Sequence, residues 1–246
     1  MSERRADYDT IGVDYADLRK PDPRIAAQIH AALGDARTVL NVGAGTGNYE
    51  PIDRQVTALE PSAEMIAQRL PGSAPVVQGH AEDLPFDDNS FDAAMAVLTV
   101  HHWSDQPKGL SEMRRVAKGP VVILTFDPDG HGGWLGDYLP ELIDLDAQIM
   151  PSLTAYKEAL GMVEITPVLV PADCSDGFLA AYWKRPEAYL DPRIRAGISS
   201  FWKIANVETA MAQLARDLAG GEWHRRYADL LELDEIDAGY RLVVTK

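Results

Sequence analysis

Several classes of protein are excluded by what the sequence has little of. Cys174 is its only cysteine, so no intrachain disulfide can form. The 23 Lys and Arg residues are outnumbered by 38 Asp and Glu residues, and the resulting formal charge of -15 disfavours phosphate backbones and anionic lipids as partners. The first residues lack the apolar core of a signal peptide, and no run of about 18 apolar residues predicts a membrane span. We therefore expect a cytoplasmic protein that acts on neither nucleic acid nor membranes.

The length and the hydrophobic content of the chain indicate one globular unit. The chain has 246 residues, of which 46% are hydrophobic, enough to bury a full core and too many for a disordered chain. It contains no internal repeat of about 20 to 50 residues and no low-complexity tract. We expect a single domain, with or without an embedded cap, that acts as a monomer or a homodimer. The sequence does not choose between those two states.

A glycine-rich turn at residues 43–47 organises the chain. Residues 38–42 before it are short, apolar and β-branched, a pattern typical of a buried strand. Gly43, Gly45 and Gly47 then permit positive φ angles and let a ligand approach bare peptide groups. The pattern predicts a strand, a tight ligand-binding loop and a helix that starts soon afterwards.

An acidic residue ends the next apolar run. Residues 55–59 predict a second strand, and Glu60 follows it, where a carboxylate can accept hydrogen bonds from a ribose diol. The G-x-G-x-G spacing differs from the G-x-G-x-x-G/A of dinucleotide-binding loops, and the Lys-Ser/Thr of a P-loop is missing. Glu50, close to the loop, would also repel phosphate. A nucleoside ligand is indicated, and a nicotinamide-dependent oxidoreductase, whose Tyr-Lys or cysteine motifs are missing, is disfavoured.

The remaining elements follow from apolar periodicity and from turn residues. Ser62 is a candidate N-cap for a helix that follows Glu60. Further helices are predicted at residues 7–19, 23–33, 106–117 and 151–161. Further strands are predicted at residues 74–78, 91–98, 121–126, 162–170 and 239–245.

In four stretches, residues 39–47, 58–65, 79–103 and 112–126, the sequence resembles the class I S-adenosylmethionine-dependent methyltransferases. Within that family it is similar to the methyltransferase type 11 group, which includes ubiquinone and menaquinone methylases. The resemblance implies an α/β, Rossmann-like, doubly wound sheet of seven strands. The sheet would be mostly parallel, with the last strand antiparallel between the fifth and sixth. One domain over residues 1–246 would comprise a helical lid (1–35), a cofactor-binding core (36–127) and helical substrate caps (128–160 and 173–235).

The resemblance also implies S-adenosylmethionine as cofactor, with S-adenosylhomocysteine as product. Tyr15 and Arg19 of the leader would close over its methionine end, Arg19 as counter-ion to the carboxylate; alternatively, Arg19 is an exposed residue on a helix surface. The backbone N–H of Ala81 and the side chain of Glu82 would meet the adenine, because His80 stands where many relatives have Asp. The implied cofactor-binding residues are Tyr15, Arg19, Gly43, Ala44, Gly45, Gly47, Glu60, Pro61, Met65, Ala81, Glu82, Val97 and Leu98.

Methyl transfer from a sulfonium needs neither a metal nor a covalent enzyme intermediate, so we expect no metal site. If the acceptor is a hydroxyl or an acidic carbon, a base would help, and His101 and His131 are the candidates. His101 and His102 are adjacent, so we expect their side chains to point in different directions and to form no metal pair. The alternative for His101 is packing or capping of the following helix.

The acceptor is expected to be a small molecule. Trp134, Tyr138 and Leu139 are candidates for an apolar wall beside it, although an exposed loop fits them equally. The aromatic residues between 173 and 219 either line a pocket for a flat or greasy acceptor or pack a helical cap against the sheet. A relative that binds S-adenosylmethionine or another nucleoside and regulates a partner without methylating anything is the alternative function, and the glycine motif does not separate the two.

Overall fold

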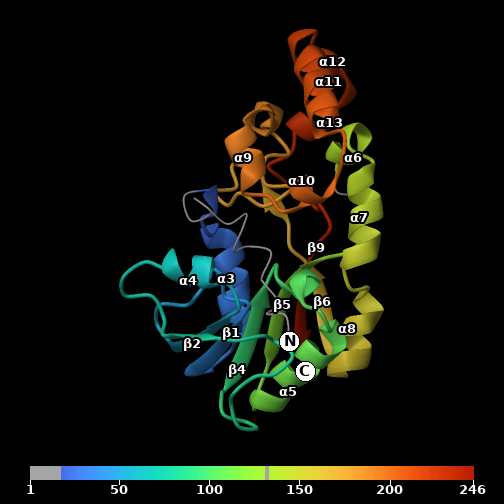
Figure 1. Ribbon diagram of the computed structural model, residues 1–246. Helices are drawn as coiled ribbons and strands as arrows, with labels where there is room; N and C mark the ends of the chain where they lie inside the picture. Colours follow the sequence, from blue (N-terminus) through green and yellow to red (C-terminus); the bar gives the residue numbers. More distant parts are fainter. Residues whose placement is uncertain (1–17, 131–132) are drawn as a thin grey trace.

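The computed structural model describes residues 18–130 and 133–246 of the chain (Figure 1). Most of the helix predicted at residues 7–19 lies outside the described residues, as do two candidate site residues, Tyr15 and His131. The assignments made to those two residues remain predictions.

Seven strands of the described chain form one twisted sheet in the order β3-β2-β1-β4-β5-β9-β6 (Figure 1). The first five of this order are parallel, and β9 pairs antiparallel with both β5 and β6. This topology confirms the predicted fold class. The strands are β1 (Thr38–Val42), β2 (Gln55–Glu60), β3 (Val76–Gln78), β4 (Ala93–Val97), β5 (Val121–Phe126), β6 (Val163–Pro167) and β9 (Tyr240–Thr245).

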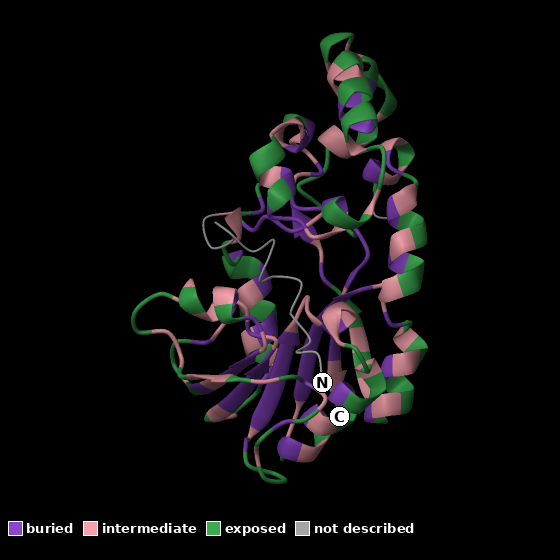
Figure 2. Cartoon of the chain, in the orientation of Figure 1, coloured by how far each residue is buried: buried purple, intermediate pink, exposed green. Residues whose placement is uncertain are grey.

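The central strands are buried on both faces, as Figure 2 shows by their purple colour. Alternate residues of a strand point to opposite faces, so each strand supplies two apolar layers. Along β4, Ala93 and Met95 pack in one buried cluster, and Ala94 and Ala96 pack in the other. This double burial explains why β4 and β5 are continuous apolar runs rather than alternating patterns.

Helices cover the two faces of the sheet. On one face, α3 (Pro23–Ala32) buries Ile25 and Ile29. On the other face, α5 (Gln106–Val116) packs with α8 (Leu153–Leu160), which falls within the first predicted cap segment but lies against the sheet. The short helix α4 (Ala63–Ala67) begins after β2, where Ser62 Oγ accepts a hydrogen bond from Met65 N at 3.2 Å. The predicted N-cap is confirmed.

The helix predicted just after the glycine loop is absent from the structure. Residues 43–54 run from β1 to β2 as turns. Three glycines and Pro51 in this connection oppose helix formation, and the link is too short for a helix together with its return loops. Tyr49 folds inward from this connection and contributes to the same core as α3.

The predicted strand 162–170 is divided in two. Residues after Val168, whose N donates to Tyr240 O of β9, leave the main sheet. Beyond them β7 (Val170–Pro171) pairs antiparallel with β8 (Glu235–Ile236) in a separate two-stranded ribbon. Proline has no N–H to donate, so Pro167 and Pro171 occur where the ladder ends. The ribbon flanks residues 172–234, which form the second part of the cap.

The cap lies above the sheet in the view of Figure 1. Its core contains Trp134, Tyr189 and Trp223, with the Trp134 ring centroid 5.5 Å from Tyr189 and 5.2 Å from Trp223. Leu139 is buried with them, so the side chains expected to wall the acceptor site instead form the core of the cap. The elements of this region are α6 (Leu135–Tyr138), α7 (Glu141–Ile149), η2 (Pro186–Leu190), α9 (Pro192–Ala196), α10 (Ser200–Lys203), α11 (Val207–Ala219), α12 (Glu222–Arg226) and α13 (Ala228–Leu231).

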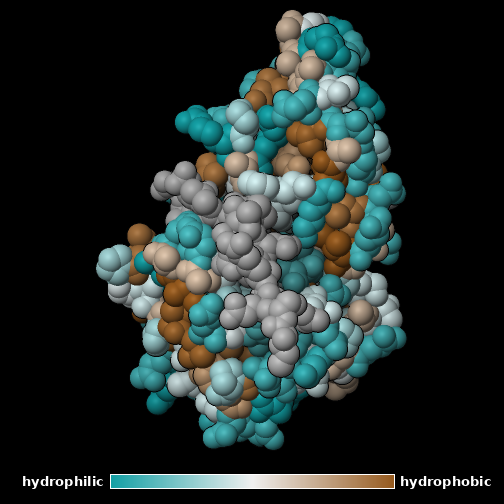
Figure 3. All heavy atoms as spheres, viewed as in Figure 1, coloured by the Kyte–Doolittle hydropathy of each residue, from teal (hydrophilic) through white to brown (hydrophobic). Residues whose placement is uncertain are grey.

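The surface has both polar and apolar parts. Hydrophobic side chains gather along the side of α7 that faces α10, and Ile143 of α7 is half exposed (Figure 3). Within residues 18–130 and 133–246, no helix combines the length and the apolar character needed to cross a membrane.

Candidate active site

A cavity of about 300 Å³ lies beside the glycine loop at the carboxyl ends of β1, β2 and β4. This edge of a doubly wound sheet is the usual place for a ligand. The cavity wall contains every predicted cofactor-binding residue except Gly47, which lies behind it, and Tyr15, which is not described. Lining residues that the sequence analysis did not select are Asn41, Thr46, Asn48, Tyr49, Leu59, His80, Thr99, His102, Trp103 and Ser104.

The backbone of the glycine loop forms one wall of this first cavity. Gly43 N and Ala44 N donate to Leu59 O at 2.8 and 3.0 Å, which anchors the loop to β2. A Cβ on Gly43 would lie 2.1 Å from Thr99 Oγ1, so only glycine fits there. Gly45 has a φ of 53° and a Cβ position with nothing within 4 Å, so a side chain there would extend into space beside the ligand cavity.

Gly47 contributes to the packing behind the loop. A Cβ there would lie 3.1 Å from Nη1 of Arg69, which itself donates to Gly45 O at 3.2 Å. Nη2 of Arg69 pairs with the Glu50 carboxylate at 2.8 Å, and both side chains are at least nine-tenths buried. The expectation that Glu50 repels phosphate is therefore wrong, because Arg69 compensates its charge.

Glu60 lies at the base of the cavity, buried, with its carboxylate tied to the loop. Oε2 accepts from Gly45 N at 2.8 Å, and Oε1 accepts from Ser62 N at 2.9 Å. These bonds orient a negative charge at the end of β2, where a ribose diol would donate to it. The only Lys or Arg side chain that lines the described cavity is Arg19, so a pyrophosphate would find little compensating charge.

At the other end of the cavity, Glu82 holds the segment that follows β4. Its Oε1 accepts from Ser104 N at 2.7 Å, Ser104 Oγ at 2.6 Å and Asp105 N at 3.1 Å. Burial raises the pKa of Glu82, but the hydrogen bonds from Ser104 and Asp105 outweigh it and the pKa is lowered. Trp103, fixed in this way, packs over Gly109, where a Cβ would lie 2.5 Å from the indole.

The two adjacent histidines lie in a 3₁₀ turn, η1 (Val100–His102), instead of on the end of a strand. Their ring centroids are only 4.0 Å apart, so the prediction that the two side chains point in different directions is wrong. The two rings nevertheless line different cavities: His102 lines the first, and His101 lines a second one. Burial lowers the pKa of His101 well below its usual value and that of His102 to about 3. Both imidazoles are therefore neutral at pH 7.

The second cavity adjoins the first and is smaller, with about 50 Å³ of space. Arg19 and Leu98 line both cavities. Leu98 has a φ of 51°, a left-handed conformation that costs a branched residue energy and that occurs mainly at functional sites. Three aromatic rings, from Phe126, Phe178 and Tyr240, form part of its wall. The wall also contains the carboxyl group of Asp146, which the sequence analysis did not identify.

Arg19 links the leader to the cap. Its Nε donates to Asp176 Oδ1 at 2.6 Å, and the other carboxylate oxygen accepts from the hydroxyl of Tyr49 at 2.7 Å. Asp176 is buried, so the guanidinium predicted to meet a cofactor carboxylate already has a carboxylate partner on the protein.

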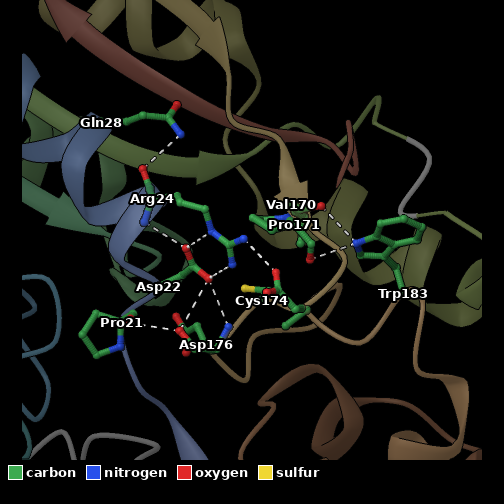
Figure 4. Close-up of polar contacts among 12 residues, drawn as sticks. Pro21, Asp22, Arg24, Gln28, Val170, Pro171, Cys174, Asp176 and Trp183 are labelled. Atoms are coloured by element: carbon green, nitrogen blue, oxygen red, sulfur yellow. Dashed lines mark hydrogen bonds and ion pairs between the residues drawn. The ribbon is translucent and has the colours of Figure 1, made fainter. Parts of the chain in front are cut away.

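A second polar cluster fastens the start of α3 to the same loop of the cap (Figure 4). Asp22 accepts from Arg24 Nη2 at 2.7 Å and from Ser175 N at 3.1 Å, and its Oδ1 caps α3 at Arg24 N. Burial raises the pKa of Asp22, but the bonds from Arg24 and Ser175 outweigh it, and the pKa lies well below its usual value. The segment before α3 is thereby held against the cap loop.

Metal ligation finds no support in the part of the chain that the structure describes. No group of three or more His, Cys, Asp or Glu side chains is placed there to hold a metal ion. Cys174 is buried, and burial raises the pKa of its thiol to about 12.

Comparison with known proteins identifies the family. A family model described as a methyltransferase domain matches residues 40–123. The solved structure of a candidate methyltransferase from an antibiotic biosynthesis pathway of Anabaena variabilis is 37% identical, with a TM-score of 0.86, over 93% of this chain and 99% of that one. The match therefore includes the cap as well as the sheet.

Curated relatives match over less than half of the chain. An uncharacterised methyltransferase of Mycobacterium tuberculosis is 35% identical over 120 residues, which are 45% of this chain and 48% of that protein. A ubiquinone/menaquinone biosynthesis C-methyltransferase of a Geobacter species is 34% identical over 111 residues, 38% of this chain and 47% of that protein. The chain thus spans about half the length of these curated relatives. Together with the sheet order and the glycine loop, these similarities show that the chain belongs to the S-adenosylmethionine-dependent methyltransferases.

Proposed function

We propose that this protein transfers a methyl group from S-adenosylmethionine to a small-molecule acceptor by direct in-line displacement. The observation that carries the proposal is the meeting of two cavities at Leu98 and Arg19. One cavity is walled by the glycine loop and Glu60, and the other has three aromatic rings in its wall. A cofactor in the first and an acceptor in the second would be neighbours.

The residues of the first cavity fit a nucleoside that carries no phosphate. Its volume of about 300 Å³ falls at the lower end of small-molecule sites. The hydroxyl of Thr46 lines it and, among the described residues, is buried without a hydrogen-bond partner. Glu60 would accept from the ribose, Met65 and Ala81 would pack on the adenosine, and Arg19 would bring positive charge to the methionine end. S-adenosylmethionine, once bound, would supply an electrophilic methyl group on a sulfonium.

The contribution of the chain to the reaction would be orientation and exclusion of water. Holding two reactants in line supplies on the order of 7 to 11 kcal/mol in model systems. Leu98, in its left-handed conformation, and His101 would form the boundary between the cavities. An imidazole whose pKa is far below 7 is a weak base, so His101 would accept a hydrogen bond from the acceptor more readily than it would hold a proton. His131 remains a predicted base outside the described residues.

The remaining assignments are proposals from the sequence. The charge of -15 disfavours nucleic-acid and membrane acceptors. We infer a single domain with a lid (1–35), a cofactor-binding core (36–127) and caps (128–160 and 173–235), located in the cytoplasm as a monomer or homodimer.

Calorimetric titration with S-adenosylmethionine, S-adenosylhomocysteine and NAD tests the cofactor. We expect micromolar binding of both adenosyl ligands and none of NAD. Incubation with S-adenosylmethionine and a library of small molecules, followed by mass spectrometry, then tests for a product that is one methyl group heavier. Adenosyl binding without any methylated product would favour the regulatory alternative, and binding of NAD alone would overturn the proposal.

A further inference from the structure

An acidic residue occupies an apolar position on α7. Leu142 and Asp146 are four residues apart and therefore lie on one face of the helix, which turns inward. Leu142 is 4% exposed and Asp146 is 6% exposed. The helix thus buries a carboxyl group where its packing alone would favour a leucine or a methionine.

The carboxyl group of Asp146 has no protein partner among the described residues. Its Oδ1 is buried without a hydrogen bond, and the only influence on its pKa is burial, which raises the pKa to about 6. An isolated carboxylate in such a place is costly because it has lost water and gained nothing in return. A group on a ligand would remove that cost.

Asp146 lines the second cavity together with the aromatic rings of Phe126, Phe178 and Tyr240. Among the described lining residues the only Lys or Arg is Arg19, whose guanidinium is paired with Asp176. Lys203 does not line the cavity, although its charge acts on His101. His101, on the same wall, is neutral at pH 7 because burial lowers its pKa. The described lining therefore combines apolar side chains and the polar residues Ser199 and Ser200 with one acidic group that has no partner among the described residues.

We propose that Asp146 recognises the methyl acceptor and that the acceptor is a small, flat or compact apolar molecule with an amino group. This inference rests on the proposed function, since it takes the second cavity as the acceptor site. An ammonium group supplies both charge and N–H donors to a buried carboxylate, and such bonds are about twice as strong as neutral ones. The cavity is small, with about 50 Å³ of space, which favours the compact end of a molecule over a long chain.

The acidic balance of the chain supports the choice of a cation over an anion. A net charge of -15 attracts cationic small molecules and repels carboxylates and phosphates. A metal ion is a poorer occupant, because no described group of three or more His, Cys, Asp or Glu side chains is available to hold one.

The test uses three probes with the same ring: benzylamine, benzyl alcohol and benzoate. Each is titrated calorimetrically into the full chain saturated with S-adenosylhomocysteine. The variants are Asp146→Asn, which keeps the shape and removes the charge, and Asp144→Asn, which makes the same change on the exposed side of α7. We expect benzylamine to bind wild type and Asp144→Asn alike and to bind Asp146→Asn at least about 10-fold more weakly. Benzyl alcohol should change less than about 3-fold, and benzoate should not bind.

Equal binding of benzylamine to wild type and Asp146→Asn, or no binding to either, would overturn the assignment of Asp146. A second variant, Asp146→Leu, guards against a folding artefact. It should lose benzylamine binding while its melting temperature rises by about 2 to 8 °C, because a buried unpaired acid is replaced by an apolar residue. A lower melting temperature would indicate that Asp146 has a structural partner instead.

The titration with S-adenosylhomocysteine keeps this inference separate from the proposed function. Binding of the nucleoside by Asp146→Asn with unchanged affinity, combined with loss of benzylamine, supports both. If no variant binds the nucleoside but benzylamine binding still depends on Asp146, the methyltransferase proposal fails and the amine site stands.

Discussion

The two cavities differ in how they are built. The first is lined almost entirely by residues 41–104, from consecutive strand ends, and its polar groups are mostly bonded to the protein. The second draws on Arg19, Leu98, Asp146, Phe178 and Tyr240, which are far apart in the chain. The carboxyl group of Asp146 lacks a partner among the described residues. Local sequence can specify the first kind of site, whereas the second exists only when the cap has folded onto the sheet.

The largest expected effect comes from a substitution that disrupts the first cavity and leaves the second intact. Gly45→Val places a branched side chain at a φ of 53° in the space beside the cavity, and we expect at least about a 100-fold loss of S-adenosylhomocysteine affinity, about 3 kcal/mol, in calorimetric titration. Gly34→Val is the matched control, since Gly34 has a φ of 57°, also has open space at its Cβ and lies away from both cavities. The control should lose stability but keep its affinity. Equal affinity for both variants would show that the loop does not contact the ligand.

The second prediction concerns the unpaired acid of the other cavity. Because burial raises the folded-state pKa of Asp146 from 3.8 to about 6, the folded protein binds more protons than the unfolded chain between these values. The Asp146 contribution to the free energy of unfolding therefore falls as pH rises from about 4 to 6, by roughly 2 to 3 kcal/mol.

Urea denaturation of wild type and Asp146→Asn across pH 4 to 7.5 measures this contribution as the difference between the two curves. Asp146→Asn should become progressively more stable relative to wild type over that interval and stay level above about pH 7. Asp144→Asn, on the exposed side of the same helix, should show no such trend. Parallel curves for wild type and Asp146→Asn would mean that the acid is partnered.

The third prediction concerns Glu60, in the part of the first cavity where we expect the ribose to bind. Glu60→Ala should weaken S-adenosylhomocysteine binding by roughly 1.5 to 3 kcal/mol, since the carboxylate is expected to accept charge-assisted bonds from the ribose. Glu60→Gln separates that role from loop anchoring, because an amide oxygen can still accept from Gly45 N. Glu64→Gln, on the neighbouring helix and outside the cavity, is the control. Wild-type affinity in a folded Glu60→Ala variant would refute the ribose role.

The smallest expected effect concerns the hydrogen bond between Tyr49 and Asp176, which joins the β1–β2 connection to the cap loop. Tyr49 has a φ of 64°, and its hydroxyl donates to Asp176 at 2.7 Å inside the protein. Removing that hydroxyl in Tyr49→Phe should cost about 1 to 2 kcal/mol of unfolding free energy in urea titrations. Tyr138→Phe, whose hydroxyl donates to Asp217 at 2.8 Å in a half-exposed part of the cap, should cost less than about 1 kcal/mol. A larger loss of unfolding free energy for Tyr138→Phe than for Tyr49→Phe would show that the bonds of Arg19 and Tyr49 to Asp176 do not hold the leader and the cap together.

The sheet and the first cavity were largely predictable, and the reasons are local. Apolar runs that end in glycine or an acidic residue mark strand ends, and Ser62 marks a helix start through one hydrogen bond over three residues. The helix predicted after the glycine loop is absent because the glycines and Pro51 of that connection oppose helix formation. The rings of His101 and His102 meet because a 3₁₀ turn, not a strand, carries them.

Other parts of the site carried no signal in the sequence. Arg69 and Glu50 pair behind the loop from positions that look like surface charges, and Asp146 looks like one of several acids on an amphipathic helix. Trp134 seemed suited to an acceptor wall, but it packs with other aromatic rings of the cap. In each case the partner is distant in the chain, so burial and pairing depend on the fold.

The sequence by itself determined the class of the sheet, the position of the ligand loop and the acid at the end of the second strand, because short-range backbone geometry and strand periodicity set these features. Only the tertiary structure decided which charges are compensated, which aromatic rings line a cavity and which acid has no partner among the described residues. Those properties depend on the removal of water by distant segments that close over a side chain, and no local pattern records that closure.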